Sequence, residues 1–399
     1  MTARSPAGER SSPSPGVPAA DVVALLDTWI ARAIAQGASD IHFEPGETHM
    51  RIRYRLDGLL HEVDALPRAL AENIIARLKV LAGLLTYRTD IPQEGAFSRP
   101  ADEQAAGSRS AVSTATSMAG RVDLDLRVAT FPTIRGERAV VRLLHPVAPV
   151  SGLDGLGLAE DAVNSLRRAA EQPSGLILVT GPAGSGKSTT LYALARHILR
   201  ATPGRSVVSL EDPVEQRVEG MAQIQISPHG ELDYVRAMRS LLRQDVQVLL
   251  VGEVRDDQTA HIVVEASLTG HLIMSTLHSG DPAEAMVRLL EMGIAPYQLV
   301  GALSVVCSQR LLRTLCTQCQ GQPPCAHCCD TGFHGRIACG QVTVLDEELR
   351  TAVLQRKSAG ELRRIVNGKG RSLAADARRL IHQGRTTDSE ALRVLGDLS

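Results

Sequence analysis

The 399-residue sequence lacks several features that would assign it to a class at once. Its formal net charge is −1, so no strong positive field indicates nucleic acid as the main partner. It contains no run of 18 apolar residues, and its N-terminus lacks the apolar region of a signal peptide, so we expect neither a membrane-spanning helix nor export. Lysine is scarce, since only Lys79, Lys187, Lys357 and Lys369 occur among the 43 basic residues. This scarcity gives weight to any lysine that falls inside a recognisable motif.

The stretch from Gly175 to Ala193 is the most informative part of the chain. An apolar run is followed by a glycine-rich loop with GxxxxGK[ST] spacing and then by helix-forming residues, which is the order of a phosphate-binding (Walker A) loop. Glycines allow successive backbone N–H groups to turn toward phosphate oxygens. The helix N-terminus and Lys187 add positive charge, and the Ser188 hydroxyl can bind Mg²⁺. A glycine-rich turn with a chance lysine is the alternative. The residues predicted to hold a nucleoside triphosphate are Gly181, Pro182, Ala183, Gly184, Ser185, Gly186, Lys187, Ser188 and Thr189.

The first third of the chain predicts a smaller α+β domain over residues 21–146, preceded by a disordered leader over residues 1–20 that is rich in Ser, Pro and Gly. Helical periodicity runs from Asp21 to about Gly37 and from Pro67 to about Leu84. Strands are predicted at Met50–Leu56, Val122–Val128 and Ala139–Leu144. Residues from about 99 to 120 predict a surface insertion, and residues 147–157 predict a linker.

From residue 158 the pattern changes to buried strands that alternate with helices, which is typical of a parallel sheet covered on both faces. The predicted strands are Leu176–Thr180, Val207–Leu210, Val248–Val251 and Leu272–Thr276. Polar residues directly follow each strand, and in a doubly wound sheet the carboxyl ends of the strands meet at one crevice. The sequence therefore predicts a doubly wound α/β domain over residues 158–312, with its site beside the glycine-rich loop.

Three of these strand ends carry candidate catalytic groups, namely Glu211, Glu253 and His278. A nucleotide hydrolase needs carboxylates that order Mg²⁺ and polarise the attacking water, and a polar group that senses the γ-phosphate. We assign metal support to Glu253, water orientation to Glu211 and γ-phosphate sensing to His278. For each acid taken alone, a solvated loop residue is the alternative. His271, at the start of the strand that His278 follows, fits a structural role equally well.

These motifs together resemble the secretion ATPase superfamily of type II secretion and type IV pilus assembly. The matching segments lie throughout the chain after residue 20: Ala38–Pro45, Arg51–Gly58, Asp90–Gly95, Glu211–Glu215 (aspartate box), Gly252–Glu253 (Walker B) and Gly270–His278 (histidine box). The resemblance implies a P-loop (RecA-like) ATPase that uses ATP and Mg²⁺. It also implies that Arg127 and Arg142 reach the nucleotide phosphates, although an arginine on the strand surface could instead pair with Asp123 or Asp125.

The sequence departs from the family pattern at two places. The family usually has Pro-Asp before the Walker B strand, where this chain has Val246-Gln247; the Gly-Glu pair is retained, so we expect metal handling to persist. Longer relatives carry another N-terminal domain that docks to an inner-membrane platform protein, and here the leader alone precedes Asp21.

Six of the seven cysteines fall between Cys307 and Cys329, which indicates a metal site rather than a disulfide framework. Cys316, Cys319, Cys325 and Cys328 form two CxxC pairs separated by five residues, and four converging thiolates bind Zn²⁺ tetrahedrally. Cys329 and His327 are possible substitute ligands, whereas Cys307 and Cys339 look like ordinary thiols. Because the segment has few aromatic residues and no basic run, a structural zinc role is favoured over nucleic-acid binding.

The overall prediction is an α/β protein with an N-terminal α+β domain, a P-loop ATPase domain, a four-cysteine zinc module over residues 313–340 and helices over residues 341–399. By resemblance, we expect a ring-forming, hexameric assembly that is cytoplasmic and peripheral to the inner membrane. It would work with platform proteins, without nucleic acid, to power pseudopilus assembly in type II secretion. A type IV pilus extension or DNA-uptake motor is one alternative, and a non-hydrolysing nucleotide-binding scaffold is another.

Overall fold

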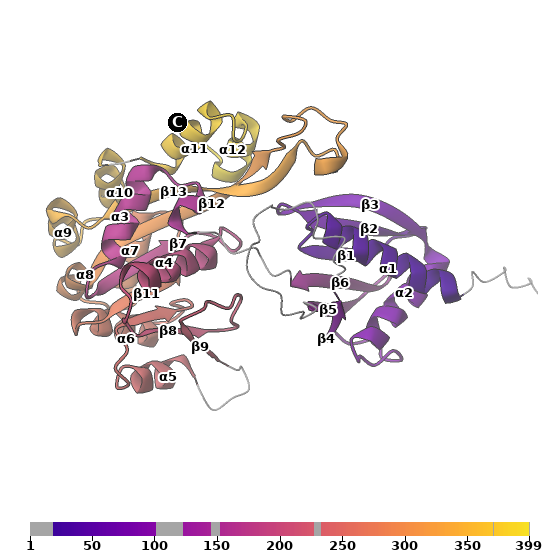
Figure 1. Cartoon of the computed structure of the whole chain (residues 1–399), viewed down its shortest axis with the longest axis horizontal. Helices are drawn as coiled ribbons and strands as arrows, with labels where there is room; N and C mark the ends of the chain where they lie inside the picture. The colour runs from indigo at the N-terminus through magenta and orange to yellow at the C-terminus, as the bar shows by residue number, and fades with distance from the viewer. Residues whose placement is uncertain (1–18, 101–122, 145–151, 227–232, 370, 399) are drawn as a thin grey trace, which may run out of the picture. The chain divides into compact units, whose positions relative to one another are not determined.

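A computed structural model describes residues 19–100, 123–144, 152–226, 233–369 and 371–398. The chain divides into two compact units, Met1–Pro146 and Val147–Ser399 (Figure 1). The predicted leader (residues 1–20) and insertion (about 99–120) fall almost entirely outside the described residues, as does the first part of the predicted linker (147–157). Within the described part of the chain, no helix combines the length and the apolar character needed to cross a membrane.

The first unit is a six-stranded antiparallel sheet with the order β3-β2-β1-β6-β5-β4 and two helices. Its elements are α1 (Ala19–Ala35), β1 (Asp40–Pro45), β2 (His49–Leu56), β3 (Leu59–Pro67), α2 (Arg68–Leu81), β4 (Gln93–Pro100), β5 (Asp123–Thr133) and β6 (Gly136–Leu144). On β2 the alternation of arginine with apolar residues places Ile52 and Tyr54 in the core while Arg51 stays exposed. The sequence predicted both helices and three of these strands, but it did not predict β1, β3 and β4.

The second unit contains a mixed seven-stranded sheet with the order β13-β12-β7-β11-β10-β8-β9, in which β13 alone runs antiparallel to its neighbour. The central strands are β7 (Gly175–Thr180), β8 (Val207–Glu211), β10 (Val248–Val251) and β11 (Leu272–Leu277), close to their predicted positions. They are buried along their whole length because successive apolar side chains enter two different cores: Leu176 and Leu178 enter one, Ile177 and Val179 the other.

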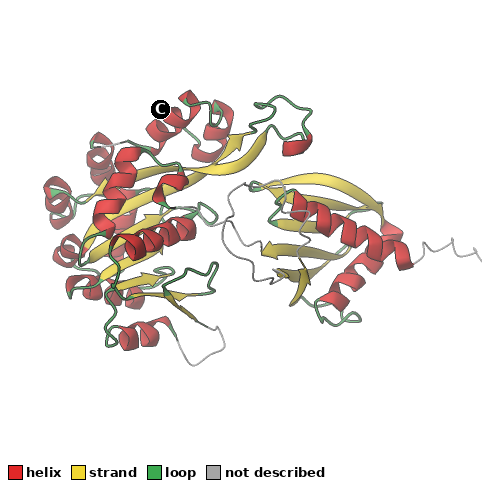
Figure 2. Ribbon diagram, viewed as in Figure 1, coloured by secondary structure: helices red, strands yellow, loops and turns green. Residues whose placement is uncertain are grey.

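Helices supply the apolar side chains that cover both faces of this sheet (Figure 2). One face is covered by the short 3₁₀ turn Leu153–Leu156, α3 (Glu160–Ala170) and α4 (Lys187–Ala201). The other face is covered by α5 (Tyr234–Leu241), α6 (Asp257–Leu268), α7 (Pro282–Glu291), α8 (Pro296–Ala302), α9 (Glu347–Leu354) and α10 (Ala359–Gly368). The protein is thus an α/β fold, and one edge of this sheet is the short parallel strand β9 (Ala222–Gln225).

Two long strands that the sequence did not predict, β12 (Leu303–Leu315) and β13 (Phe333–Val344), form a hairpin next to β7. The CxxC pairs lie in the connection between these strands, so the predicted cysteine segment is continuous with the main sheet. Helices α11 (Leu373–His382) and α12 (Asp388–Leu395) pack against the hairpin. The finer division of the second unit at residues 312 and 340 remains a prediction.

Candidate active site and cysteine cluster

The glycine-rich loop joins β7 to α4, and three of its glycines have positive φ: Gly181 (148°), Gly184 (73°) and Gly186 (88°). A Cβ atom at Gly181 would lie 2.5 Å from the carbonyl oxygen of Gln309, and one at Gly186 would lie 2.8 Å from the Gln309 Nε2. The backbone angle therefore requires glycine at both positions, and at Gly181 the contact with a backbone atom requires it as well. The loop is pressed closely against β12.

The side chain of Lys187, the first residue of α4, folds back over this loop. Its Nζ donates hydrogen bonds to the carbonyl oxygens of Gly181 (2.9 Å) and Pro182 (3.0 Å). Burial lowers the pKa of Lys187, the positive charge of Arg310 lowers it further, and Glu215 acts in the opposite direction. A cation held on the loop backbone at a helix N-terminus is an arrangement that attracts a phosphate group.

The remaining loop residues fit a bound phosphate. Pro182, Ala183 and Gly184 are exposed at the tip, and Ser188 and Thr189 are partly buried in the first turn of α4. The hydroxyl of Ser185 is buried and has no hydrogen-bond partner within the described part of the chain. Such a buried hydroxyl has an unused capacity for a ligand's hydrogen bond, because an unpaired buried polar group is otherwise costly.

Glu211 is the last residue of β8 and is buried. Its carboxylate accepts hydrogen bonds from the hydroxyl groups of Tyr192 and Ser209 and, at 3.2 Å, from the amide of Gln223. Three donors from α4, β8 and β9 therefore hold this carboxylate in a fixed position. The sequence located Glu211 at the strand end but did not find the residues that hold it.

Tyr192 is one of the residues that the sequence analysis did not identify. Besides donating to Glu211, its hydroxyl accepts hydrogen bonds from the backbone N–H groups of Glu215 (3.2 Å) and Gln216 (3.3 Å). Burial raises the pKa of Tyr192, and the hydrogen bond to Glu211 raises it further. A protonated phenol thus links α4 to the segment that follows β8, which is the segment that matches the aspartate box.

Glu253 and His278 follow the neighbouring strands β10 and β11 and are in direct contact. The Nε2 of His278 lies 3.2 Å from the Oε2 of Glu253, and the other oxygen of Glu253 accepts a hydrogen bond from Arg255. Partial burial lowers the pKa of His278, and the charges of Lys187 and of two arginines lower it further. The lowered pKa favours the neutral form of His278, and the influence of Lys187 shows that the two predicted strand ends and the loop are brought together.

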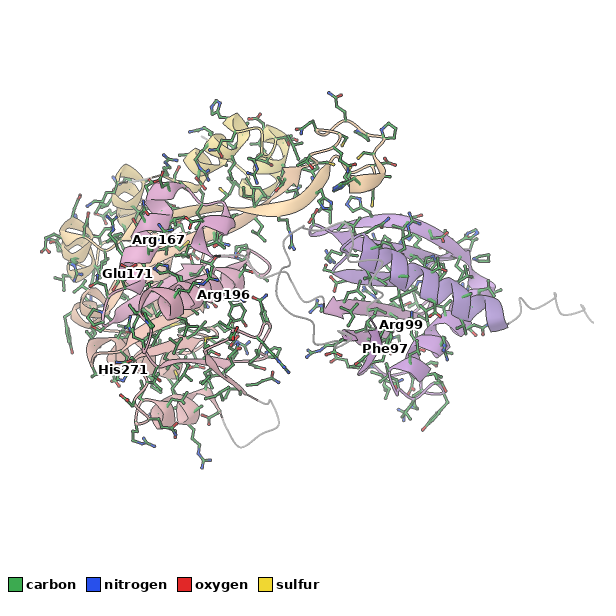
Figure 3. The ribbon with its side chains drawn as sticks, in the orientation of Figure 1. Phe97, Arg99, Arg167, Glu171, Arg196 and His271 are labelled. Atoms are coloured by element: carbon green, nitrogen blue, oxygen red, sulfur yellow. The ribbon has the colours of Figure 1, made fainter. Side chains whose placement is uncertain are left out.

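Three other sequence-predicted residues belong neither to the glycine-rich loop nor to the ends of β8, β10 and β11 that carry the candidate catalytic groups. His271, labelled in Figure 3, precedes β11 at the end of that strand opposite to His278, and its Nδ1 lies 3.1 Å from the carbonyl oxygen of Ala266. Arg127 and Arg142 belong to the first unit, where they are paired across β5 and β6. Arg142 donates from its Nε to Asp40 at 3.0 Å. Their predicted role as phosphate ligands remains a prediction.

The four cysteines of the two CxxC pairs come together in the connection between β12 and β13, where their sulfur atoms all lie within 4.8 Å of one another. The Sγ atoms of Cys316 and Cys325 are 3.9 Å apart, and those of Cys319 and Cys328 are 3.7 Å apart. A tetrahedral zinc ion with Zn–S bonds of about 2.3 Å has sulfur atoms roughly 3.8 Å apart, so the cluster fits zinc. The predicted four-cysteine cluster is therefore present.

The chemistry of the cluster also suits a metal. Hydrogen bonds from the backbone N–H groups of Cys319 and Gln318 stabilise the thiolate of Cys316 and lower its pKa to about 7. Burial raises the pKa of Cys328 to about 12, so the thiolate form of this residue needs a bound cation to stabilise it. Cys307 and Cys339 are buried in the apolar cores, away from the cluster.

Comparison with known proteins places the chain in a family. Residues 18–393 match the family of type II/IV secretion system proteins. The type II secretion system protein HxcR of Pseudomonas aeruginosa is 39% identical over 386 residues, which span 95% of this chain and 78% of that protein. The type IV pilus assembly ATPase PilB of Thermus thermophilus is 36% identical over 390 residues, which span 91% of this chain and 42% of that protein.

Among solved structures, the ATPase DotB of Yersinia pseudotuberculosis has the same fold. It superposes with a TM-score of 0.71 at 24% identity, over 98% of this chain and 97% of that chain. The chain therefore belongs to the type II/IV secretion system protein family. The resemblance stated from the sequence is confirmed, and with it the assignment as a secretion ATPase.

Proposed function

We propose that this chain is the ATPase motor of a type II secretion system, in which hydrolysis drives pseudopilus assembly and protein export. The observation that carries the proposal is the convergence of Lys187, Glu253 and His278 beside the glycine-rich loop, in a chain that matches the family over residues 18–393. The second unit would then be a P-loop (RecA-like), doubly wound ATPase domain. We further propose a hexameric ring that works at the cytoplasmic face of the inner membrane with platform proteins, without nucleic acid.

The proposed site binds ATP and Mg²⁺ through residues of the loop and of the strand ends. The backbone N–H groups of residues 183–189 and the Lys187 amine would hold the phosphates, and Ser188 and Glu253 would hold the metal. When bound, Mg²⁺ neutralises part of the negative charge of the phosphates. The pKa of His278 is lowered, which favours the neutral imidazole, and a neutral imidazole could exchange a hydrogen bond with the γ-phosphate group.

Glu211 is proposed to orient the attacking water. Its carboxylate is held by Tyr192 and Ser209, and the 3.2 Å bond from Gln223 is the one that a water can most easily replace. A carboxylate in a fixed position lowers the entropic cost of aligning that water. Arg127 and Arg142 are proposed, from the family resemblance, to bind the phosphates, and Arg142 would then exchange its bond to Asp40 for a phosphate.

Zn²⁺ is the proposed occupant of the four-cysteine cluster, with Cys316, Cys319, Cys325 and Cys328 as its ligands. Four thiolates close the tetrahedral coordination, so the ion would be structural. It would fix the connection between β12 and β13, where the chain forms neither helix nor strand over most of its length.

The second candidate is a type IV pilus extension or DNA-uptake motor, which the similarity to PilB favours. The alignment spans 78% of HxcR but 42% of PilB, so the type II assignment ranks first. Complementation separates the two: restored protein export in a strain without its type II secretion ATPase supports the proposal. Restored piliation in a strain without its pilus extension ATPase supports the alternative.

Phosphate release by the purified chain with ATP and Mg²⁺ tests hydrolysis itself. The Lys187→Ala variant should lose turnover, because the loop then has no amine for the phosphates. Lys357→Ala is the matched control, since Lys357 lies between α9 and α10 and its removal should leave the rate unchanged. Substantial turnover in Lys187→Ala would overturn the site assignment. A wild-type chain that binds ATP without hydrolysing it would instead support a nucleotide-binding scaffold.

A further inference from the structure

We propose that Gln309 is a positioning residue for the nucleotide-binding loop. Its buried side-chain amide joins the loop backbone to the first turns of α4 and thereby sets the direction of an N–H group that faces the phosphates. The inference rests on the proposed function, because it names a residue that shapes the same site without touching the nucleotide.

Both ends of the Gln309 amide are engaged. Nε2 donates a hydrogen bond to the carbonyl oxygen of Ser185 at 2.8 Å, and Oε1 accepts one from the hydroxyl of Thr190 at 2.7 Å. Gln309 is 1% exposed and Thr190 is fully buried. Because the amide is a rigid planar group, these two bonds fix the position of Ser185 relative to α4.

The bond to Ser185 has a directional consequence. In a trans peptide unit the C=O and the following N–H point in opposite directions. Since the carbonyl group of Ser185 points at Gln309, the N–H of Gly186 points away from β12, toward the other side of the loop. An N–H at that position, next to Lys187 and at the start of α4, belongs to the concave set of donors that binds a phosphate.

The sheet itself places Gln309 against the loop. In the parallel pairing of β12 with β7, Ser308 lies opposite Thr180, and their hydroxyl groups are 2.7 Å apart. Gln309 is the next residue, at the point where β7 gives way to the loop. The backbone carbonyl oxygen of Gln309 lies close to Gly181, and its side-chain amide lies close to Gly186. The loop therefore packs directly against this residue.

The variant that tests the proposal is Gln309→Met, which keeps the side-chain volume and removes both hydrogen bonds. Because the loop holds the phosphates alike in the ground state and in the transition state, KM for ATP should rise while kcat changes little. We expect KM to rise about 5- to 100-fold, the range that corresponds to an unsatisfied buried carbonyl group.

Gln341→Met is the matched control. Gln341 is also buried, lies on β13 opposite Ser308, and donates through its amide to Asn367 at 3.1 Å. Its replacement removes a comparable hydrogen bond from the same hairpin but touches no loop residue. It should lower Tm to a similar extent and leave KM for ATP as in the wild type.

Thr190 supplies an independent test that leaves Gln309 in place. Thr190→Val removes the hydroxyl group that donates to Gln309 and should raise KM for ATP. Thr190→Ser keeps this hydroxyl group, and its KM for ATP should equal that of the wild type. This pair decides the question even if Gln309→Met does not fold.

The inference is overturned if Gln309→Met and Gln341→Met have the same KM for ATP at similar Tm, or if Thr190→Val and Thr190→Ser do not differ in KM. Failure of the proposed function gives another pattern, in which the wild-type chain neither binds ATP nor releases phosphate. If the wild type is active and Lys187→Ala is not, an unchanged KM in Gln309→Met refutes the positioning role alone.

Discussion

The buried carboxylate of Glu390 on α12 allows a quantitative prediction. It accepts hydrogen bonds from the backbone N–H (3.1 Å), Nε (3.0 Å) and Nη2 (2.8 Å) of Arg313 on β12, and from the Nε (2.8 Å) and Nη2 (2.7 Å) of Arg393. Its side chain has no exposed surface. This carboxylate therefore anchors the last helix to the strand that leads into the four-cysteine cluster.

The stabilisation follows from the pKa of Glu390. Burial acts to raise this pKa, but the hydrogen bonds from Arg393 and Arg313 outweigh it and lower the pKa from 4.5 to about 2. This difference corresponds to about 3 kcal/mol of stability for the ionised form. Because the folded-state pKa is the lower one, the stabilisation is complete above about pH 4.5 and is lost as the pH falls toward 2.

Glu390→Gln removes this charge without changing the size of the side chain. The free energy of unfolding of the second unit at pH 7 should fall by about 3 kcal/mol, and amide hydrogen exchange in α12 should accelerate. At pH 3.5 the gap between the two proteins should narrow by about 1.4 kcal/mol, because the wild-type carboxylate no longer contributes fully. Glu265→Gln, at an exposed position on α6, is the control and should change stability by less than about 0.5 kcal/mol.

The reasoning would be refuted by a loss below about 1 kcal/mol at pH 7. It would equally be refuted if the gap between wild type and Glu390→Gln stayed constant from pH 7 to pH 3.5. A constant gap would mean that packing of the side chain, rather than its charge, stabilises the contact between α12 and β12.

Three further predictions concern other parts of the chain. Lys79→Met should destabilise the first unit by about 3–5 kcal/mol in denaturant unfolding, because the buried Nζ of Lys79 lies 2.5 Å from the carboxylate of Glu137, which would be left unpaired. Cys325→Ser should lower the zinc content, measured by elemental analysis, well below one ion per chain, since three thiolates cannot close the tetrahedron. Gly181→Ala should weaken ATP binding, measured by equilibrium titration, by at least about tenfold, because it combines about 1–3 kcal/mol of backbone strain with a clash on the Gln309 carbonyl oxygen.

Each of these variants has a control in the same chain. Lys357→Met replaces a partly exposed lysine and should leave stability almost unchanged. Cys329→Ser should retain the zinc ion, and loss of the metal in this variant would show that the ligand set is wrong. Gly360→Ala lies in α10 with open space around its Cβ position and should stabilise the fold by about 0.5–1 kcal/mol. Equal ATP affinity in Gly181→Ala and the wild type would refute the claim that the loop requires glycine there.

The strands that the sequence predicted well are those whose environment leaves a simple pattern. β7, β10 and β11 are buried on both faces, so their continuous apolar runs identify them. β12 has no such pattern, because Ser308, Gln309 and Arg310 interrupt its apolar residues to form contacts with the loop and with Gly280. The polar residues that make these contacts therefore prevent β12 from being recognised as a strand in the sequence.

The same contrast applies to the site. Lys187 and Ser188 follow from a local spacing, and the four cysteines follow from two short repeats, so the sequence alone locates them. The contact of Gln309 with Ser185 joins residues 124 positions apart, and no periodicity encodes a contact over that separation. Tyr192 was missed for a related reason, since a tyrosine in an amphipathic helix reads as a core residue until Glu211 is placed beside it.

Strand β12 contacts the nucleotide-binding loop through Gln309 and helix α12 through Arg313, and the hairpin geometry makes these two contacts independent of each other. The pairing of β12 with β7 ends at Ser308, directly before Gln309, whereas the contact of β12 with Glu390 is made four residues further along, at Arg313. Between these points β13 holds β12 by antiparallel pairing, so a loosened α12 does not release Gln309 from the loop. Glu390→Gln should therefore lower the stability of the hairpin and its retention of zinc while KM for ATP stays as in the wild type. A raised KM in Glu390→Gln would show instead that β12 transmits the state of the cysteine end to the nucleotide site.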